Sequence, residues 1–217
     1  RRQVERTGLL GDAGIEVRVG FARQRGIGVA GDGDQLAAQA RALAVGAPVG
    51  YNEAVTFWDG ANWLSPIPGV PTTTWVGTFG TYHAATGLEL FVSGGFAGQN
   101  MDYVARWTGS DWAAAGEGLT TLVSAFCEFD EGHGPVLFAT GGMNIPGNGD
   151  CFYIARWDGQ SWTPVRHGLN GSGFAMAVFD DGRGPALYIG GGFTRVDTQY
   201  QTGGMAANHI VRWDGAD

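Results

Sequence analysis

The sequence predicts an all-β protein built from repeated four-stranded antiparallel sheets. Two observations lead to this prediction: a tryptophan motif recurs at regular spacing, and many of the 39 glycines in 217 residues stand at the ends of short apolar runs. Short strands separated by glycine and aspartate turns are typical of all-β folds. A disordered chain is excluded because 44% of the residues are hydrophobic and 8 are Trp, which is more apolar surface than such a chain carries.

A four-residue motif defines the repeat. It centres on one tryptophan in each copy, and the copies are separated by 49, 50 and 56 residues: Trp58, Trp107, Trp157 and Trp213. A second tryptophan stands five residues after each of the first three, at Trp63, Trp112 and Trp162. Before each of the last three motifs an apolar run ends in paired glycines, at Gly94–Gly95, Gly141–Gly142 and Gly190–Gly191. Self-similarity at such a period indicates a repeat architecture.

Each repeat is expected to form four short strands. In the third unit the expected strands are Phe174–Phe179, Ala186–Gly190 and His209–Trp213, and the unit before it supplies an example of the fourth strand at Ser161–Val165. Runs of about five or six residues match the usual length of strands in globular proteins. The order of the strands along the chain favours antiparallel hairpins.

The turn between the two tryptophans of a unit sets their relative position. Asp158–Gly159 is the sequence of a two-residue type I′ turn, in which both central residues have positive φ. With that turn, Trp157 pairs with Gln160 and Ala155 pairs with Trp162, so that both tryptophans lie on one face of the sheet. Ile154 and other apolar residues occupy the opposite face. A four-stranded sheet that is apolar on both faces and repeats about every 50 residues is typical of a β-propeller blade.

These motifs resemble the kelch family of β-propellers. The order in that family is an apolar strand ending in Gly-Gly, an aromatic residue and then Trp, and residues 51–217 repeat this order. The resemblance extends most closely to bacterial arrays with an Arg-Trp-Asp-Gly signature. It implies four-stranded antiparallel blades and an extracellular or cell-envelope location. Residues 51–217 hold about three and a third units, fewer than the roughly 4–8 blades of a closed propeller, so part of a larger propeller is expected.

Residues 1–50 differ from the rest of the chain. They contain seven Arg, five acidic residues and no Trp, whereas residues 51–217 contain six Arg and sixteen acidic residues. We therefore expect two regions, an unassigned segment over 1–50 and the kelch-like repeats over 51–217. The first segment is open to two interpretations, a degenerate blade or a non-native sequence. Within it Val17–Phe21 resembles a strand and Gln35–Val45 resembles a helix.

Several sequence patterns resemble catalytic, cofactor or metal sites, but structural roles explain them better. Gly26–Gly31 matches a dinucleotide-binding fingerprint but lacks a preceding apolar strand and a correctly spaced carboxylate, so chance in a glycine-rich chain is the better explanation. The acidic hairpins at Asp130–Glu131 and Asp180–Asp181 suit tight turns better than a Ca²⁺ site, which needs about 6–8 oxygen ligands. The four histidines lack the spacing of metal ligands. No metal or other cofactor is therefore expected.

The recurring arginines and the two cysteines also favour structure. Arg106, Arg156 and Arg212 occupy one position in each unit, which indicates a role in joining neighbouring units rather than in anion binding. Cys127 and Cys151 are expected to be buried free thiols, although a bridge between them is open from sequence. No apolar stretch is long enough to span a membrane as a helix. A net charge of −8 disfavours binding to nucleic acid.

The loop after the paired glycines is the candidate site. Its length varies from 96–102 to 143–152 and 192–208, and binding residues are often carried by loops on a rigid scaffold. In the longest of these loops the candidate ligand-binding residues are polar or aromatic: Phe193, Arg195, Asp197 and Tyr200. The leading hypothesis is a non-enzymatic scaffold that binds a protein or glycan. Two alternatives stay open, a propeller enzyme of the galactose-oxidase or sialidase type and an inert spacer in a long repeat protein.

Overall fold

The described residues form eighteen β-strands and no helix, which confirms the all-β prediction for this part of the chain. The computed structural model describes residues 20–21, 27–29, 42–45, 55–58, 63–64, 73–96, 103–107, 112–115, 119, 121–144, 152–197 and 203–215. The side chains are described from residue 77 onward, with residue 96 left out. Strand pairing is antiparallel in every sheet of these residues.

Five short strands form the first sheet in chain order. They are β1 (Gly20–Phe21), β2 (Ile27–Val29), β3 (Ala42–Val45), β4 (Val55–Trp58) and β5 (Trp63–Leu64). Strand β3 pairs with β4, so this sheet contains residues from both sides of position 50. The helix expected at Gln35–Val45 is wrong over Ala42–Val45, because that segment pairs on both sides with other strands. Pairing with neighbours overrides a weak local preference.

Three further sheets contain the side chains that position the site. Sheet I consists of β6 (Thr73–Ala84), β7 (Gly87–Phe96), β8 (Val104–Trp107) and β9 (Trp112–Ala114). Sheet II consists of β10 (Val123–Asp130), β11 (Pro135–Asn144), β12 (Phe152–Trp157) and β13 (Trp162–Pro164). Sheet III has three strands, β14 (Gly173–Asp180), β15 (Pro185–Gly191) and β18 (Ile210–Trp213). The three strands expected in the third unit and the fourth strand expected in the second are therefore present, with ends that shift by at most one residue.

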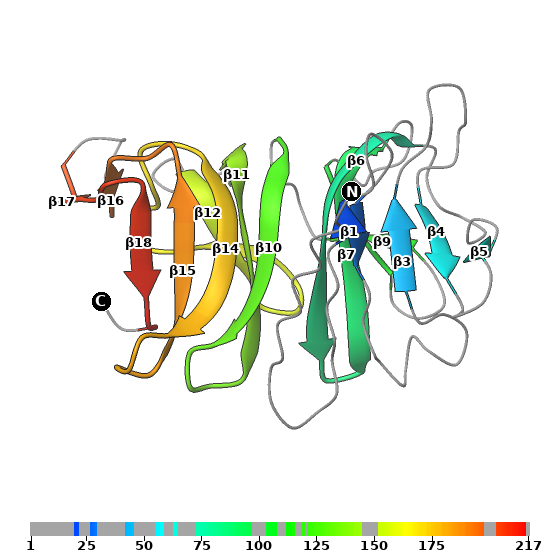
Figure 1. The fold of residues 1–217 in the computed structure, drawn as a ribbon, viewed down its shortest axis with the longest axis horizontal. Coiled ribbons are helices and arrows are strands. Elements are labelled where there is room, and N and C mark those ends of the chain that lie inside the picture. The colour runs from blue at the N-terminus through cyan, green and yellow to red at the C-terminus, as the bar shows by residue number, and fades with distance from the viewer. Residues whose placement is uncertain are drawn as a thin grey trace, which may run out of the picture.

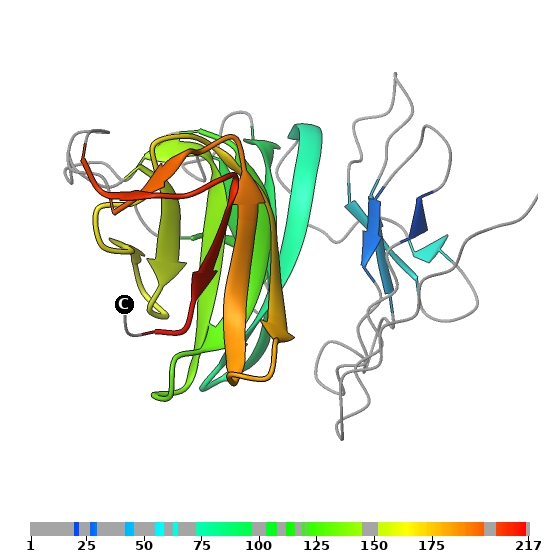
Figure 2. The ribbon, with the colours of Figure 1, turned by 60° about the vertical axis from the view of Figure 1, so that its left-hand side comes forward.

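The sheets are neighbours through their first strands. Strand β10 contacts β6 on one side and β14 on the other, an order that Figures 1 and 2 also show. Sheet II is therefore covered on both faces. This arrangement explains why its strands carry apolar residues on both sides, a pattern that a sheet with one solvated face would not need.

The turn predicted at Asp158–Gly159 is wrong in its register. Trp157 pairs directly with Trp162, and Ala155 pairs with Pro164. The Asp158 Oδ1 atom accepts hydrogen bonds from the N–H groups of Gln160 and Ser161, both at 2.8 Å, and this side-chain bonding stabilises a longer loop. Of the two residues Asp158 and Gly159, only Gly159 has a positive φ, of 101°, whereas a type I′ turn needs a positive φ at both. The two tryptophans still lie on one face, with ring centroids 5.3 Å apart.

The core between sheets I and II is aromatic. Phe91 of β7 is fully buried and meets the Trp157 and Trp162 rings at centroid distances of 5.6 and 6.1 Å. Phe126 of β10 stacks on Trp162 at 6.3 Å. Edge-to-face and stacked aromatic pairs contribute about 0.5–1.5 kcal/mol beyond their buried area. Trp162, from the fourth strand, therefore fills the space between the two sheets.

The core between sheets II and III combines phenylalanine and aliphatic side chains. Its fully buried members include Phe138, Leu187 and Phe193, with Ile189 almost fully buried. Trp213 of β18 is half-buried, and its Nε1–H donates to Glu131 Oε1 of sheet II at 2.6 Å. This hydrogen bond joins sheet III to the β10–β11 hairpin of sheet II.

Strand register corrects the position of the third glycine pair. Leu90, Leu137 and Leu187 each pair with the motif tryptophan of their own sheet. Counted from these leucines, Gly191–Gly192 correspond to Gly94–Gly95 and Gly141–Gly142, one residue later than the pair expected at Gly190–Gly191. Gly190 instead corresponds to Ser93 and Thr140.

Candidate binding pocket

The longest variable loop folds into a small β-ribbon. Strands β16 (Arg195–Val196) and β17 (Met205–Ala206) pair with each other, and residues 198–202 between them lie outside the described part. The ribbon is fixed to the segment between β13 and β14. Asn170 Oδ1 accepts hydrogen bonds from the N–H groups of Thr194 and Arg195, both at 2.8 Å. The Asp197 N–H donates to the Gly168 carbonyl at 2.8 Å, so the loop is held at its base.

Asp197 is the charged centre of this base. Its Oδ1 atom lies 2.9 Å from Nδ1 of His167, and its Oδ2 atom lies 3.6 Å from a guanidinium nitrogen of Arg166. The hydrogen bond from His167, with the nearby Arg166 charge, holds the pKa of the Asp197 carboxyl below its ordinary value, although partial burial opposes this shift. Asp197 and Arg166 both have positive φ, 55° and 50°. Non-glycine residues in this region are often found at ligand sites, where the surrounding structure maintains the strain.

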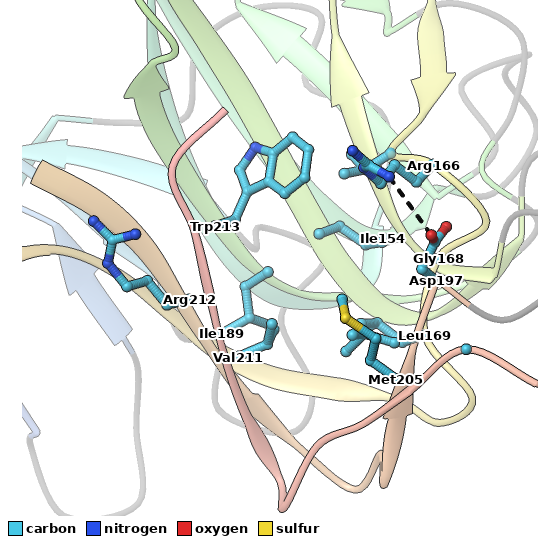
Figure 3. A pocket seen from close by; sticks show the side chains of 13 residues that line it. Ile154, Arg166, Gly168, Leu169, Ile189, Asp197, Met205, Val211, Arg212 and Trp213 are labelled. Atoms are coloured by element: carbon cyan, nitrogen blue, oxygen red, sulfur yellow. Dashed lines mark ion pairs between the residues drawn. The ribbon is translucent and has the colours of Figure 1, made fainter. Parts of the chain in front are cut away.

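A cavity of about 340 Å³ lies between sheets II and III beside this ribbon. Figure 3 shows its lining, which is mostly aliphatic on the floor and charged at the rim. Sheet II contributes Ile154, and sheet III contributes Ile189, Val211 and Trp213. The volume is at the lower end of the range for ligand pockets, about 300–1,000 Å³.

The rim of the pocket is formed by the ribbon and by two arginines. Met205 of β17 lines the pocket and is 61% exposed. The guanidinium of Arg166 lies 5.7 Å from the centroid of the Trp213 ring, a cation–π distance. Arg212, also in the lining, pairs with the Asp214 carboxylate. The charged residues at the rim are thus already paired, Arg166 with Asp197 and Arg212 with Asp214. An apolar ligand group can therefore enter between them.

The candidate residues of the long loop have different environments. Asp197 lines the pocket, and Arg195 is exposed with its guanidinium donating to the carbonyl oxygens of Gly203 and Gly204 at 3.0 and 3.2 Å. Phe193 is fully buried in the core between sheets II and III, where no ligand can reach it without a rearrangement. Tyr200 lies outside the described residues.

Sequence reasoning missed most of the pocket lining. Val211 and Ile154 resemble ordinary strand residues, and Arg166 was not distinguished from other surface arginines. No local motif marks them, because they converge only when sheets II and III pack. Trp213 was assigned to the repeat. Its position beside a cavity depends on sheet II and on the long loop, which supply other residues of the lining.

Two of the three recurring arginines take part in contacts between sheets, whereas Arg212 pairs with Asp181 and Asp214 of its own unit. Arg106 pairs with Glu89 of its own sheet at 3.1 Å, and its guanidinium lies 5.5 Å from the Trp157 ring of sheet II. Arg156 pairs at 2.9 Å with Glu131, the same carboxylate that accepts the hydrogen bond from Trp213 of sheet III. These contacts link neighbouring sheets through a side-chain network.

The acidic hairpins have the turn role that was predicted. The Oδ1 atom of Asp130 accepts hydrogen bonds from the N–H groups of Gly132 and Gly134, and Asp180 does the same with Gly182 and Gly184. Within the part of the chain that the structure describes, no group of three or more metal-ligating side chains converges. The same residues include no helix that is long and apolar enough to cross a membrane.

Cys127 is a free thiol that is partly buried in β10. Burial raises its pKa to about 11, so it has little thiolate at neutral pH. Cys151 lies outside the described residues.

The fold and the pocket together define an all-β protein of packed antiparallel sheets with a loop-walled cavity in its described part. Comparison with protein-family profiles, with curated proteins and with solved structures gave no match.

Proposed function

We propose that this chain is part of a kelch-like β-propeller and serves as a binding scaffold with no catalytic role of its own. The repeated sheets support the propeller, because neighbouring first strands lie side by side and each sheet covers the face of the next. The incomplete propeller and the extracellular or cell-envelope location, which rest on the same resemblance, belong to this proposal.

The pocket beside the longest variable loop carries the binding function. Val196, Asp197, Gly204 and Met205 of that loop form one wall of the cavity, and the rigid sheets form the others. Loops that differ in length on an otherwise constant scaffold are suited to recognition. The aliphatic floor favours an apolar side chain of a protein ligand over a glycan, whose hydroxyl groups would need hydrogen-bonding partners there.

A binding screen with one pair of variants tests this proposal. The purified 217-residue protein, Met205→Asp and Phe179→Asp would be applied to peptide and glycan arrays. Met205 and Phe179 are each 61% exposed, but only Met205 lines the pocket. Both variants therefore add one charge at an exposed site, and folding should be preserved in each.

We expect ligands that bind the unmodified protein and Phe179→Asp equally and bind Met205→Asp at least about tenfold more weakly, since a charge would be placed against an apolar floor. Ligands that bind all three proteins equally would contradict the assignment of the pocket. The absence of any ligand for the unmodified protein would count against the binding function.

A further inference from the structure

The two junctions between sheets I, II and III are built alike but differ at one acidic position. At the junction of sheets II and III, the Glu131 carboxylate accepts hydrogen bonds from the guanidinium of Arg156 at 2.9 Å and from the indole Nε1–H of Trp213 at 2.6 Å. Counted from the leucines that align the sheets, the residue of sheet I at the Glu131 position is Ala84. The junction of sheets I and II therefore lacks the side-chain carboxylate that forms the bridge in the next junction.

The donors of that bridge are present in both junctions. By the same alignment, Arg106 of sheet I corresponds to Arg156, and Trp157 of sheet II corresponds to Trp213. The guanidinium of Arg106 lies 5.5 Å from the centroid of the Trp157 ring, so the two groups are adjacent. Arg106 Nε and Trp157 Nε1 are both buried, and neither has a hydrogen-bond partner in the part of the chain that the structure describes. A buried N–H group without an acceptor is unfavourable, so this junction favours the entry of one.

The glycine two residues after each tryptophan shows that space for an acceptor is present. A Cβ atom at Gly215 would lie 3.0 Å from Cβ of Glu131 and 3.4 Å from its Cγ. At Gly159, the equivalent residue, the nearest described atom beyond the chain neighbours is Oη of Tyr82, at 3.9 Å. The region that the Glu131 side chain fills in one junction is therefore open in the other. Burial and nearby carboxylates raise the pKa of Tyr82, so the hydroxyl that faces this region is protonated and can donate.

The acidic side chains around Tyr82 already have partners. Both oxygens of Glu89 accept hydrogen bonds from Arg106 at 3.1 Å. Glu128 accepts the backbone N–H of His83 at 2.6 Å and lies 2.9 Å from Nδ1 of the same residue. Asp158 accepts two backbone N–H groups of its own loop. Each of these carboxylates is thus engaged elsewhere, whereas Nε of Arg106 is still without an acceptor.

We propose that the junction of sheets I and II binds the carboxylate group of a small ligand, at the position that the Glu131 carboxylate occupies in the next junction. The Glu131 side chain exceeds that of Ala84 by one methylene and one carboxylate group, which together differ from acetate by one hydrogen atom. Arg106 and Trp157 donate to the carboxylate oxygens, and Tyr82 is the third donor. Hydrogen bonds between a guanidinium and a carboxylate are stronger than those between neutral groups. This site is separate from the pocket between sheets II and III and does not depend on the function proposed for that pocket.

Titration of the 217-residue protein with sodium acetate is the direct test. The indole N–H signals of ¹⁵N-labelled protein would be followed at neutral pH and constant ionic strength, with sodium chloride as the control salt. Trp157→Phe and Trp213→Phe would identify the two signals. We expect a saturable downfield shift of the Trp157 indole proton at millimolar acetate, because this proton gains an acceptor. The Trp213 signal should not respond, since its acceptor is already present.

Three variants compare the two junctions. Ala84→Glu supplies the carboxylate within the chain, so the Trp157 signal should be downfield without acetate and should no longer respond to it. Ala84→Leu adds a side chain of similar size without a carboxylate and should block the response without the downfield shift. Glu131→Ala is the reverse change, after which the Trp213 signal should become sensitive to acetate. The titration of the unmodified protein needs no substitution, so it tests the proposal even where a variant fails to fold.

A second ligand separates two sources of the carboxylate. N-acetyl-glutamate amide presents the same group on a peptide side chain. Binding of acetate supports a free acid as the ligand, and binding of the glutamate derivative alone supports an acidic side chain of a partner protein. Two results would overturn the carboxylate site: a Trp157 signal that responds to neither compound at high millimolar concentration, and a response that is the same in Ala84→Glu as in the unmodified protein.

Discussion

Sheets II and III are built from the same sequence pattern but differ in the burial of equivalent side chains. Phe129 is the penultimate residue of β10 in sheet II and is 6% exposed, whereas Phe179 holds the same position in β14 and is 61% exposed. Trp157 is 1% exposed and contacts Trp162, whereas Trp213 is half-buried and faces a cavity. Equivalent residues are buried in one sheet and exposed in the next, because the burial of each depends on the neighbouring unit.

This difference shows that a single unit cannot bury its own apolar residues. The aromatic side chains of sheet II are covered by sheet I on one face and by sheet III on the other. Repeat proteins share this property, since their stability comes largely from interfaces between nearest neighbours.

The largest effect is expected from Trp162→Ala. The Trp162 side chain is 5% exposed and contacts three aromatic rings, so its removal should lower the free energy of unfolding by about 3–5 kcal/mol. Trp213→Ala, at the position of sheet III that corresponds to Trp157, should cost clearly less because part of that ring already faces a cavity. Urea denaturation of both variants would measure the difference, and equal losses would contradict the comparison.

A smaller effect is expected from Gly173→Ala at the start of β14. A Cβ atom there would lie 2.1 Å from Oγ1 of Thr140 in sheet II, closer than any real contact, so we expect a loss of about 1–3 kcal/mol. Replacing Thr140 by Gly in the same protein should restore part of this loss. Gly190→Ala is the control, because its Cβ would have a nearest neighbour at 3.8 Å. Measured by thermal unfolding, a large loss for the control would show that strand glycines are required for another reason.

The acid sensitivity of the ribbon is the next prediction. Because the pKa of Asp197 is lowered by His167 and Arg166, its ionised form stabilises the folded state at pH above the unfolded value of about 3.9, and this stabilisation is lost as the pH falls through the folded pKa. The urea midpoint should therefore decrease more between pH 6 and pH 3 in the unmodified protein than in Asp197→Asn. Identical decreases would mean that Asp197 contributes nothing to the pH dependence.

The smallest effect concerns reactivity rather than stability. In a Cys151→Ser background, Cys127 should react with iodoacetamide at pH 8 roughly two orders of magnitude more slowly in the folded than in the urea-unfolded protein. The reason is that burial raises the pKa of this thiol to about 11, whereas an exposed thiol has a pKa of about 8.5. Mass spectrometry of timed samples would measure the two rates. Comparable rates would show that β10 opens readily between sheets II and III.

The strands of the repeat could be predicted from the sequence, but their register could not. Short apolar runs bounded by glycine and aspartate turns, together with the regular tryptophans, located the strands of sheets II and III. The loop after Trp157 was misjudged because Asp158 bonds two backbone N–H groups through its side chain, which the dipeptide Asp-Gly does not reveal. The run Gly190–Gly192 offers two equivalent glycine pairs, and only pairing with β14 distinguishes them.

The candidate site was predictable only in part. The long loop that supplies Asp197 was recognised from its variable length, but the pocket also needs Ile154 and Val211 from two different sheets. These residues are more than fifty positions apart in sequence and become neighbours through packing. Phe193 could not be told from an exposed aromatic residue because its burial depends on sheet II.

The contact between Thr140 and Gly173 has a consequence for how such a chain can lengthen by duplication. Ser93 of sheet I accepts a hydrogen bond from the backbone N–H of Val123, and Val123 corresponds to Gly173. A second copy of unit II inserted after the first would bring Val123 against Thr140, where no Cβ atom fits. Tandem copies of this unit would therefore have a steric clash at that junction, which a change at either position would relieve. The units are similar in sequence, yet the small residue at the start of β14 is matched to the Thr140 side chain of the preceding unit.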